Sequence, residues 1–144
     1  MSSALDRLKA LTSKISSFET ARKENMQTLK DLYSFLKIDE KIPDFKLLFE
    51  YKAMNLTGLS LQAEDLGQIK ENRYVQIICI SYDKEAKGLK SKNSSLGYFG
   101  RSDAIDENIK NAIVKFILCW RFEKSFITLE HYHDMITQVN KTSE

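Results

Sequence analysis

A seven-residue repeat over residues 4–36 is the feature that most restricts how this chain can fold. Its positions alternate spacings of three and four, and no glycine or proline interrupts them. One helix of this length extends about 50 Å at 1.5 Å per residue, which exceeds the width of a small domain. Such a helix needs a partner along its apolar side. The predicted seam comprises Ala4, Leu8, Leu11, Ile15, Phe18, Arg22, Asn25, Leu29, Leu32 and Leu36.

The narrow seam and its charges favour a parallel coiled-coil homodimer. With Leu8 at position a, Lys14 at g faces Glu19 at the following e position of the other chain, which is an attractive pair. Arg22 and Asn25 place polar groups in the seam, where they cost stability but favour one register. We therefore predict a dimer interface along the seam. The alternative is that residues 4–36 pack against their own domain or against a different subunit.

Pro43 separates this arm from the rest of the chain. The residue before a proline is pushed out of the helical region, so residues 38–43 are predicted to form a hinge. The predicted domains are a coiled-coil arm at 1–37, the hinge, and a globular head at 44–144. In the head we expect a short helix at 43–54 and strands at 59–63, 74–82 and 96–101, with a solvated loop at 83–95.

Helical spacing returns after the last predicted strand. Ser102 or Asp103 is suited to cap a helix, and a break is expected at 123–125 before Thr128 caps a final helix. Strands followed by helices predict an α+β head with C-terminal helices on one face of a small antiparallel sheet of about three strands. The apolar faces of the two helices are Ile105, Ile109, Ala112, Ile113, Phe116, Ile117 and Trp120, and then Leu129, Tyr132, Met135, Ile136 and Val139.

Composition narrows the class of protein. The net charge of +2 is too small to indicate a dedicated nucleic-acid binder. No apolar run approaches 18 residues and no secretion signal is evident, so we expect an intracellular protein with no membrane contact. Cys79 and Cys119 lie in apolar stretches, where buried reduced thiols are usual.

No pattern of catalytic residues is evident, and we expect a protein that is not an enzyme and holds no cofactor or metal. His131 and His133 are two residues apart, which places them on different faces of a helix, whereas metal pairs on helices use spacings of three or four. Gly97 and Gly100 lie within a strand pattern, and no phosphate-binding loop follows them.

Two regions are candidates for binding macromolecules. The first is basic, and phosphates are its candidate ligands, with base stacking on Tyr98 and Phe99. The second is rich in aromatic residues, which are favoured at the centres of protein interfaces. The candidate phosphate contacts are Lys84, Lys87, Lys90, Lys92 and Arg101, and the candidate partner-binding residues are Phe122, Phe126 and Tyr132.

The order of arm and head resembles the monopolin core subunit family, which functions in chromosome segregation. The local match is Asn55-Leu56-Thr57-Gly58-Leu59, which is similar to the segment that begins the first strand of that family's globular domain. Residues 74–81, 96–99 and 116–140 resemble its second strand, third strand and aromatic-rich helices. The hinge at 38–43 has no clear counterpart there, and the turn after the penultimate helix lacks the expected proline.

The resemblance implies a nuclear, V-shaped homodimer with an RWD-like head that binds kinetochore or nucleolar proteins through an apolar patch. We therefore expect a non-enzymatic homodimeric adaptor that cross-links kinetochore or chromosome-associated proteins. One alternative is a nucleic-acid-binding dimer that uses the basic region at 84–101. Another is one subunit of a heterodimeric coiled-coil kinetochore complex, since the small globular subunits of the outer-kinetochore microtubule-binding complex have a similar organisation.

Overall fold

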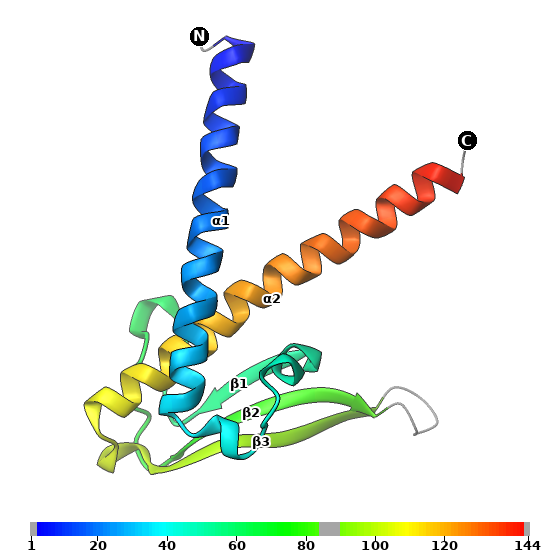
Figure 1. Ribbon diagram of the computed structural model, residues 1–144. Helices are drawn as coiled ribbons and strands as arrows, with labels where there is room; N and C mark the ends of the chain where they lie inside the picture. The colour runs from blue at the N-terminus through cyan, green and yellow to red at the C-terminus, as the bar shows by residue number, and fades with distance from the viewer. Residues whose placement is uncertain (1–2, 84–89, 143–144) are drawn as a thin grey trace.

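Two long helices and a three-stranded antiparallel sheet make up the computed structural model (Figure 1). It describes residues 3–83 and 90–142, except for the side chains of 11–17, 83 and 90. The predicted α+β class and antiparallel sheet are confirmed. In chain order the main elements are α1 (Ala4–Phe35), β1 (Ala53–Thr57), β2 (Tyr74–Asp83), β3 (Lys90–Arg101) and α2 (Glu107–Thr142). The 3₁₀ helices are η1 (Ile38–Glu40), η2 (Phe45–Glu50), η3 (Ala63–Asp65) and η4 (Ser102–Ala104).

Helix α1 is continuous, as the repeat predicts, and a capping box formed by Ser3 and Asp6 closes its N-terminus. The Ser3 hydroxyl accepts a hydrogen bond from the Asp6 amide at 3.1 Å, and the Asp6 carboxylate accepts one from the Ser3 amide at 3.4 Å. This reciprocal arrangement satisfies amides that have no partner within the helix. After Leu36 the chain turns at Lys37, which has a left-handed φ of 59°. The N-terminal half of α1 points away from the sheet (Figure 1).

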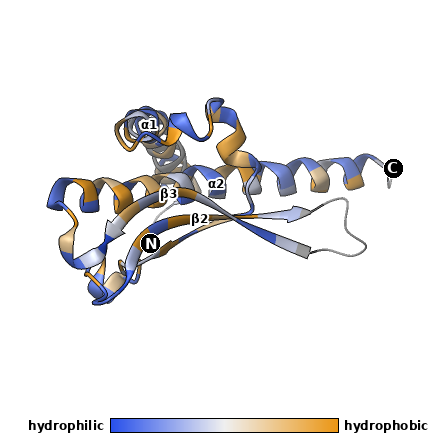
Figure 2. Cartoon of the chain, turned by 90° about the horizontal axis from the view of Figure 1, so that it is seen from below, coloured by the Kyte–Doolittle hydropathy of each residue, from blue (hydrophilic) through white to orange (hydrophobic). Residues whose placement is uncertain are grey.

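The sheet has the order β1-β2-β3, and the helices cover one of its faces (Figures 1 and 2). Along β2 every second side chain points to the helices, so that Val75, Ile77 and Cys79 are buried while Tyr74 and Tyr82 are exposed on the other face. This two-residue alternation is that of a sheet covered on one side. The sheet therefore supplies one wall of a single core.

The second half of α1 belongs to the same core as the sheet. Leu29 and Leu36 are buried together with Ile38, Leu48 and Trp120. The Trp120 indole donates a hydrogen bond to the Leu48 carbonyl at 2.8 Å, which fixes η2 against α2. The division into an arm at 1–37, a hinge at 38–43 and a separate head at 44–144 is thus wrong as a boundary, because residues on both sides of it pack in one cluster.

Helix α2 runs without interruption through residues 123–125, where the sequence predicts a break. The polar residues there are accommodated in the helix by specific partners. Glu123 pairs with Arg22 of α1, and the Ser125 and Thr128 hydroxyls donate to the carbonyls of Arg121 and Lys124, four residues earlier. Thr128 is therefore not a helix cap. At the other end, Asp106 caps α2 in place of Ser102 or Asp103, since its carboxylate accepts from the amides of Asn108 and Ile109.

Strand β1 lies earlier in the chain than the prediction of a strand at 59–63. Residues 53–57 form the strand, although a helix was expected as far as residue 54, and they pair with residues 76–80 of β2. Gly58 follows with φ of +84°, and Leu59 forms only an isolated bridge with Ile69. The expected helix at 43–54 is reduced to η2. The second predicted strand, at 74–82, is confirmed as β2.

Strand β3 is longer than its predicted range of 96–101. It begins at residue 90 and pairs with β2 from its first residue, Lys90, opposite Asp83, to Arg101 opposite Tyr74. The segment from 90 to 95, expected in a solvated loop, is thus part of the sheet. Polar residues such as Ser94 and Ser95 are compatible with an edge strand, which has a neighbour on one side only.

Candidate functional site

The crossing of α1 and α2 is held by an ion pair that the sequence does not reveal. The Arg22 guanidinium donates from Nε to both carboxylate oxygens of Glu123 at 3.0 Å and from Nη2 at 2.8 Å, and it also pairs with Glu130. Glu123 is 3% exposed. Hydrogen bonds to the two carboxylates raise the pKa of Arg22 above its ordinary value, and the bond to Glu123 has the larger effect. Arg22 therefore stays charged and fixes where the helices cross.

The other residues of the seam near this crossing also contact their own chain. Asn25 donates to the Cys119 carbonyl at 2.9 Å, and the Phe18 ring meets Phe126 edge-on with centroids 5.9 Å apart. Leu29 and Leu36 are buried and Leu32 packs partly buried against the core. The prediction of a dimer seam along the whole repeat is corrected here, because its second half faces α2 and the core. Leu8 is exposed, whereas the Leu11 and Ile15 side chains lie outside the described part.

The three predicted partner-binding aromatics do not gather in one patch. Phe122 and Phe126 are partly buried and pack against each other, with centroids 5.1 Å apart, on the side of α2 that faces α1. Tyr132 is 56% exposed and lies on another side of the helix. Two of the three residues are thus used at the helix crossing, and Tyr132 belongs to a different surface.

The C-terminal part of α2 carries an apolar stripe on an exposed helix. Its four residues follow spacings of three, four and three, which is the narrow pattern of a helix-pairing seam. All four side chains are more than half exposed, so the stripe is not part of the core. The sequence had predicted it to be the apolar face with which the last helix packs on the sheet. The α2 stripe consists of Leu129 (64%), Tyr132 (56%), Ile136 (61%) and Val139 (64%).

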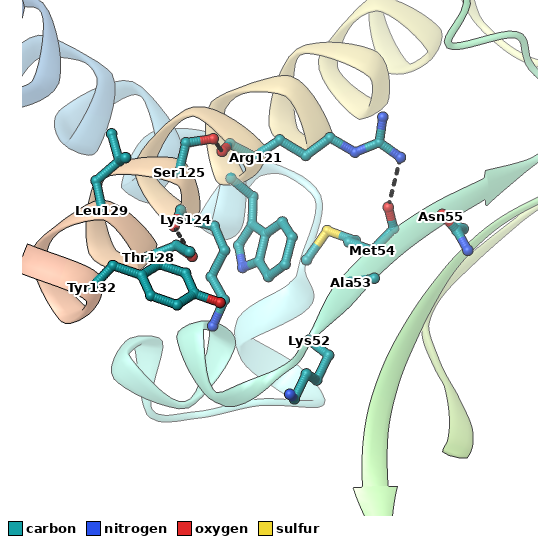
Figure 3. A pocket seen from close by; sticks show the side chains of 11 residues that line it. Lys52, Ala53, Met54, Asn55, Arg121, Lys124, Ser125, Thr128, Leu129 and Tyr132 are labelled. Atoms are coloured by element: carbon teal, nitrogen blue, oxygen red, sulfur yellow. Dashed lines mark hydrogen bonds between the residues drawn. The ribbon is translucent and has the colours of Figure 1, made fainter. Parts of the chain in front are cut away.

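A groove of about 650 Å³ lies between β1 and α2, at the base of the α2 stripe (Figure 3). On one side are residues 52–55 of β1 and the turn before it, and on the other are α2 residues that include Leu129 and Tyr132. Met54 and Trp120 contribute apolar surface. Figure 3 shows Arg121 extending across the groove toward Met54. The groove is therefore mostly apolar and continuous with the α2 stripe.

Three cations line this groove, and each contacts a neutral group, either a backbone carbonyl or an aromatic ring. Arg121 donates to the Met54 carbonyl at 3.0 Å, Lys124 donates to the Phe49 carbonyl, and the Lys52 ammonium lies 4.5 Å from the centre of the Tyr82 ring. Among the carboxylates whose side chains the structure describes, none forms an ion pair with any of the three. Burial and the neighbouring Lys52 lower the pKa of Lys124.

Sequence reasoning missed these cations. Arg121 and Lys124 are three residues apart, a spacing that places both on one side of a helix, and this was a usable signal. Lys52 had no local signal, because it reaches the same place from a segment about 70 residues earlier in the chain.

The basic region does not form one phosphate-binding patch in the described residues. Lys92 and Arg101 lie at opposite ends of β3, about 30 Å apart at 3.3 Å per residue, and Arg101 pairs with Asp103 at 3.3 Å. Tyr98 is exposed, but Phe99 is partly buried against the core, so the two aromatics do not share a face. Lys84 and Lys87 lie outside the described residues, and of Lys90 only the backbone is described.

The cysteines are buried and unpaired, as predicted. Burial raises the pKa of the Cys79 thiol to about 12 and also raises that of Cys119. Among the residues with described positions, no group of three His, Cys, Asp or Glu side chains is placed to hold a metal. His131 and His133 are exposed on α2. No helix in that part of the chain is long and apolar enough to span a membrane.

Comparison with known proteins gives no relative for this chain: no family model, no curated protein and no solved structure matches it.

Proposed function

We propose that this protein is a non-enzymatic adaptor that forms a parallel homodimer through the first half of α1. The observation that supports this proposal is the projection of α1 beyond its crossing with α2 (Figure 1). Residues 4–10 are all exposed, and the repeat continues through them with Leu8 at a seam position. An isolated helix shorter than about 12–15 residues is marginal in water, so the exposed start of α1 is expected to gain stability from a partner helix.

Because the second half of α1 is already packed in the core, a short interface between the first halves of two copies is enough to stabilise the proposed dimer. Nucleation is the costly step in forming a helix, and here the second half, anchored by Arg22 and Leu29, already provides the nucleus. A second copy then has to supply only seam contacts at Ala4, Leu8, Leu11 and Ile15. The polar seam positions Arg22 and Asn25 are occupied within the chain, so they mark where pairing between chains ends.

We propose further that the two heads of this dimer link kinetochore or chromosome-associated proteins in the nucleus. The support is the sequence resemblance of residues 55–59 to the monopolin core family. The structure departs from that family's expected pattern in two places, because 55–59 lie at the end of β1 and 116–140 belong to one continuous helix. Two identical heads on one dimer offer two equal binding sites, which is the geometry of a cross-linker. A fluorescent fusion in cells of the source organism is expected to form chromosome-associated nuclear foci, and a uniform cytoplasmic signal would count against this part.

Light scattering of the purified full chain tests the dimer. The wild-type chain is expected to have twice the mass of one copy, and Leu8→Glu is expected to be a folded monomer, because it places a charge in the seam. Ala10→Glu is the matched control, since it adds the same charge two residues away, off the seam, and should remain a dimer. A wild-type monomer that stays well folded would overturn the homodimer. An aggregated chain rescued by a second coiled-coil subunit would favour the heterodimeric alternative.

A further inference from the structure

We propose that the groove between β1 and α2, together with the α2 stripe, binds an amphipathic helix of a partner protein that carries acidic residues at the groove end. This inference names a partner for the proposed adaptor and rests on that function for its biological meaning. Its test does not need the α1 dimer. The surface begins at the groove, beside Lys52, and continues along one side of α2 to Val139.

The charges indicate an acidic partner. Arg121 and Lys124 line the groove, and Lys52 lies at its rim with its ammonium over the Tyr82 ring. No carboxylate with a described side chain forms an ion pair with any of them. Carboxylates on a docked partner would form charge-assisted hydrogen bonds at this partly desolvated site, where opposite charges interact more strongly than on an open surface. Complementary charge of this kind favours one partner and one orientation over others.

The apolar part indicates a helix. Leu129, Tyr132, Ile136 and Val139 project along about 15 Å of α2 at 1.5 Å per residue, and they lie at i, i+3, i+7 and i+10, a spacing that suits apolar anchors on one face of a second helix. An extended strand is disfavoured at the neighbouring sheet edge, because Arg121 already occupies the Met54 carbonyl of β1. A strand added there would have to displace that hydrogen bond.

Fluorescence of Trp120 provides a readout without a label. It is the only tryptophan of the chain and it lines the groove. The probe is a designed, end-blocked 18-residue helical peptide without tryptophan, with leucine at four positions spaced three, four and three, and with glutamates clustered beside the first leucine. A second peptide replaces those glutamates with lysines. We expect a saturable change in Trp120 emission with the acidic peptide and at least tenfold weaker binding of the basic one.

Variants separate the two halves of the surface. Lys52→Glu, at an exposed position, and Ile136→Glu are each expected to weaken binding of the acidic peptide at least tenfold. Lys115→Glu is the control, because it makes the same charge change on the exposed side of α2 away from the groove and should bind normally. Leu8→Glu should remove the dimer but retain peptide binding, so failure of the proposed dimer is distinguished from failure of this inference.

Several outcomes would overturn the inference. One is the lack of a saturable change with either peptide, and another is equal binding of both. If Ile136→Glu converts a dimeric chain to a monomer, a second copy occupies the α2 stripe instead. If a single-stranded 20-nucleotide DNA gives the same change in emission, lost in Lys52→Glu but kept in Ile136→Glu, the groove is a phosphate site.

Discussion

At the scale of single residues, the contact between Arg22 and Glu123 determines how firmly α1 is attached. Glu123 is almost fully buried, so removing its cation leaves a desolvated charge, which typically costs about 3–5 kcal/mol. Arg22→Leu is therefore expected to lower the free energy of unfolding by about 3 kcal/mol. Glu123→Leu should cost less, because Arg22 is more exposed and keeps Glu130 as a partner. Urea denaturation measures both.

The double variant Arg22→Leu/Glu123→Leu is the control for this pair. Apolar replacement of both members of a buried ion pair is often neutral, so the double variant should recover most of the stability that Arg22→Leu loses. Additive losses would show that the two side chains do not act as a pair.

Cys79 makes a prediction about pH. Its thiol keeps its proton in the folded chain up to about pH 12, whereas an ordinary cysteine in the unfolded chain loses it near pH 9. Between these values the unfolded state binds fewer protons, so stability falls as pH rises, by up to about 1.4 kcal/mol per pH unit. Cys79→Val removes this term. The stability difference between the two chains should be constant from pH 6 to 8 and shift against the wild type above pH 9; parallel curves throughout would contradict it.

At the scale of elements, Gly58 fixes how β1 leaves the sheet. Its φ of +84° disfavours other residues, and a Cβ there would lie 2.6 Å from the Tyr74 carbonyl oxygen. Gly100 has a similar φ of +87° but open space around it. Gly100→Ala should therefore cost only the left-handed conformation, about 1–2 kcal/mol, and Gly58→Ala at least about twice that. Equal losses in urea denaturation would show that β1 can move away from Tyr74 without cost.

The sequence predicts the extent of α1 better than it predicts what α1 packs against. The repeat over 4–36 identifies α1 almost to the residue, because its spacing is a local property. It does not say what faces the seam, since Leu29 packs equally well against a second copy or against α2. The break expected at Glu123 fails for the same reason: a charge in a helix is compatible with continuation once Arg22, 101 residues away in the chain, is seen to neutralise it.

The candidate binding surface illustrates the same division. Leu129, Tyr132, Ile136 and Val139 are recognisable from spacing as one apolar face, but only the fold shows that α2 diverges from the sheet along this part of its length. These residues were predicted to lie in the core because apolar helix faces are usually buried. Lys52 joins the groove because the start of β1 lies beside α2, which is a contact between distant segments.

At the scale of the whole molecule, the protein is one core from which two helical arms diverge (Figure 1). The two helices cross at Arg22 and Phe126. The α1 arm is the part of α1 that precedes this crossing, and the α2 arm is the part of α2 that follows it. Their apolar positions lie on separate helices, so one arm is available for a second copy while the other is available for a different partner. This separation fits the proposed adaptor, because the proposed dimer and the proposed partner site would then not compete.

Truncation tests this organisation and the boundary between arm and core. A chain beginning at Phe18 keeps every described contact of α1 with α2, so it should unfold cooperatively, lose at most about 1 kcal/mol of stability and be a monomer by light scattering. A chain beginning at Lys41 lacks Leu29, Tyr33, Leu36 and Ile38, and should show no cooperative unfolding, because four buried side chains are missing from the core. Circular dichroism during heating distinguishes the two. If the Lys41 chain instead melts cooperatively at the wild-type temperature, residues 44–144 form an independent head after all, and α1 is an arm along its whole length.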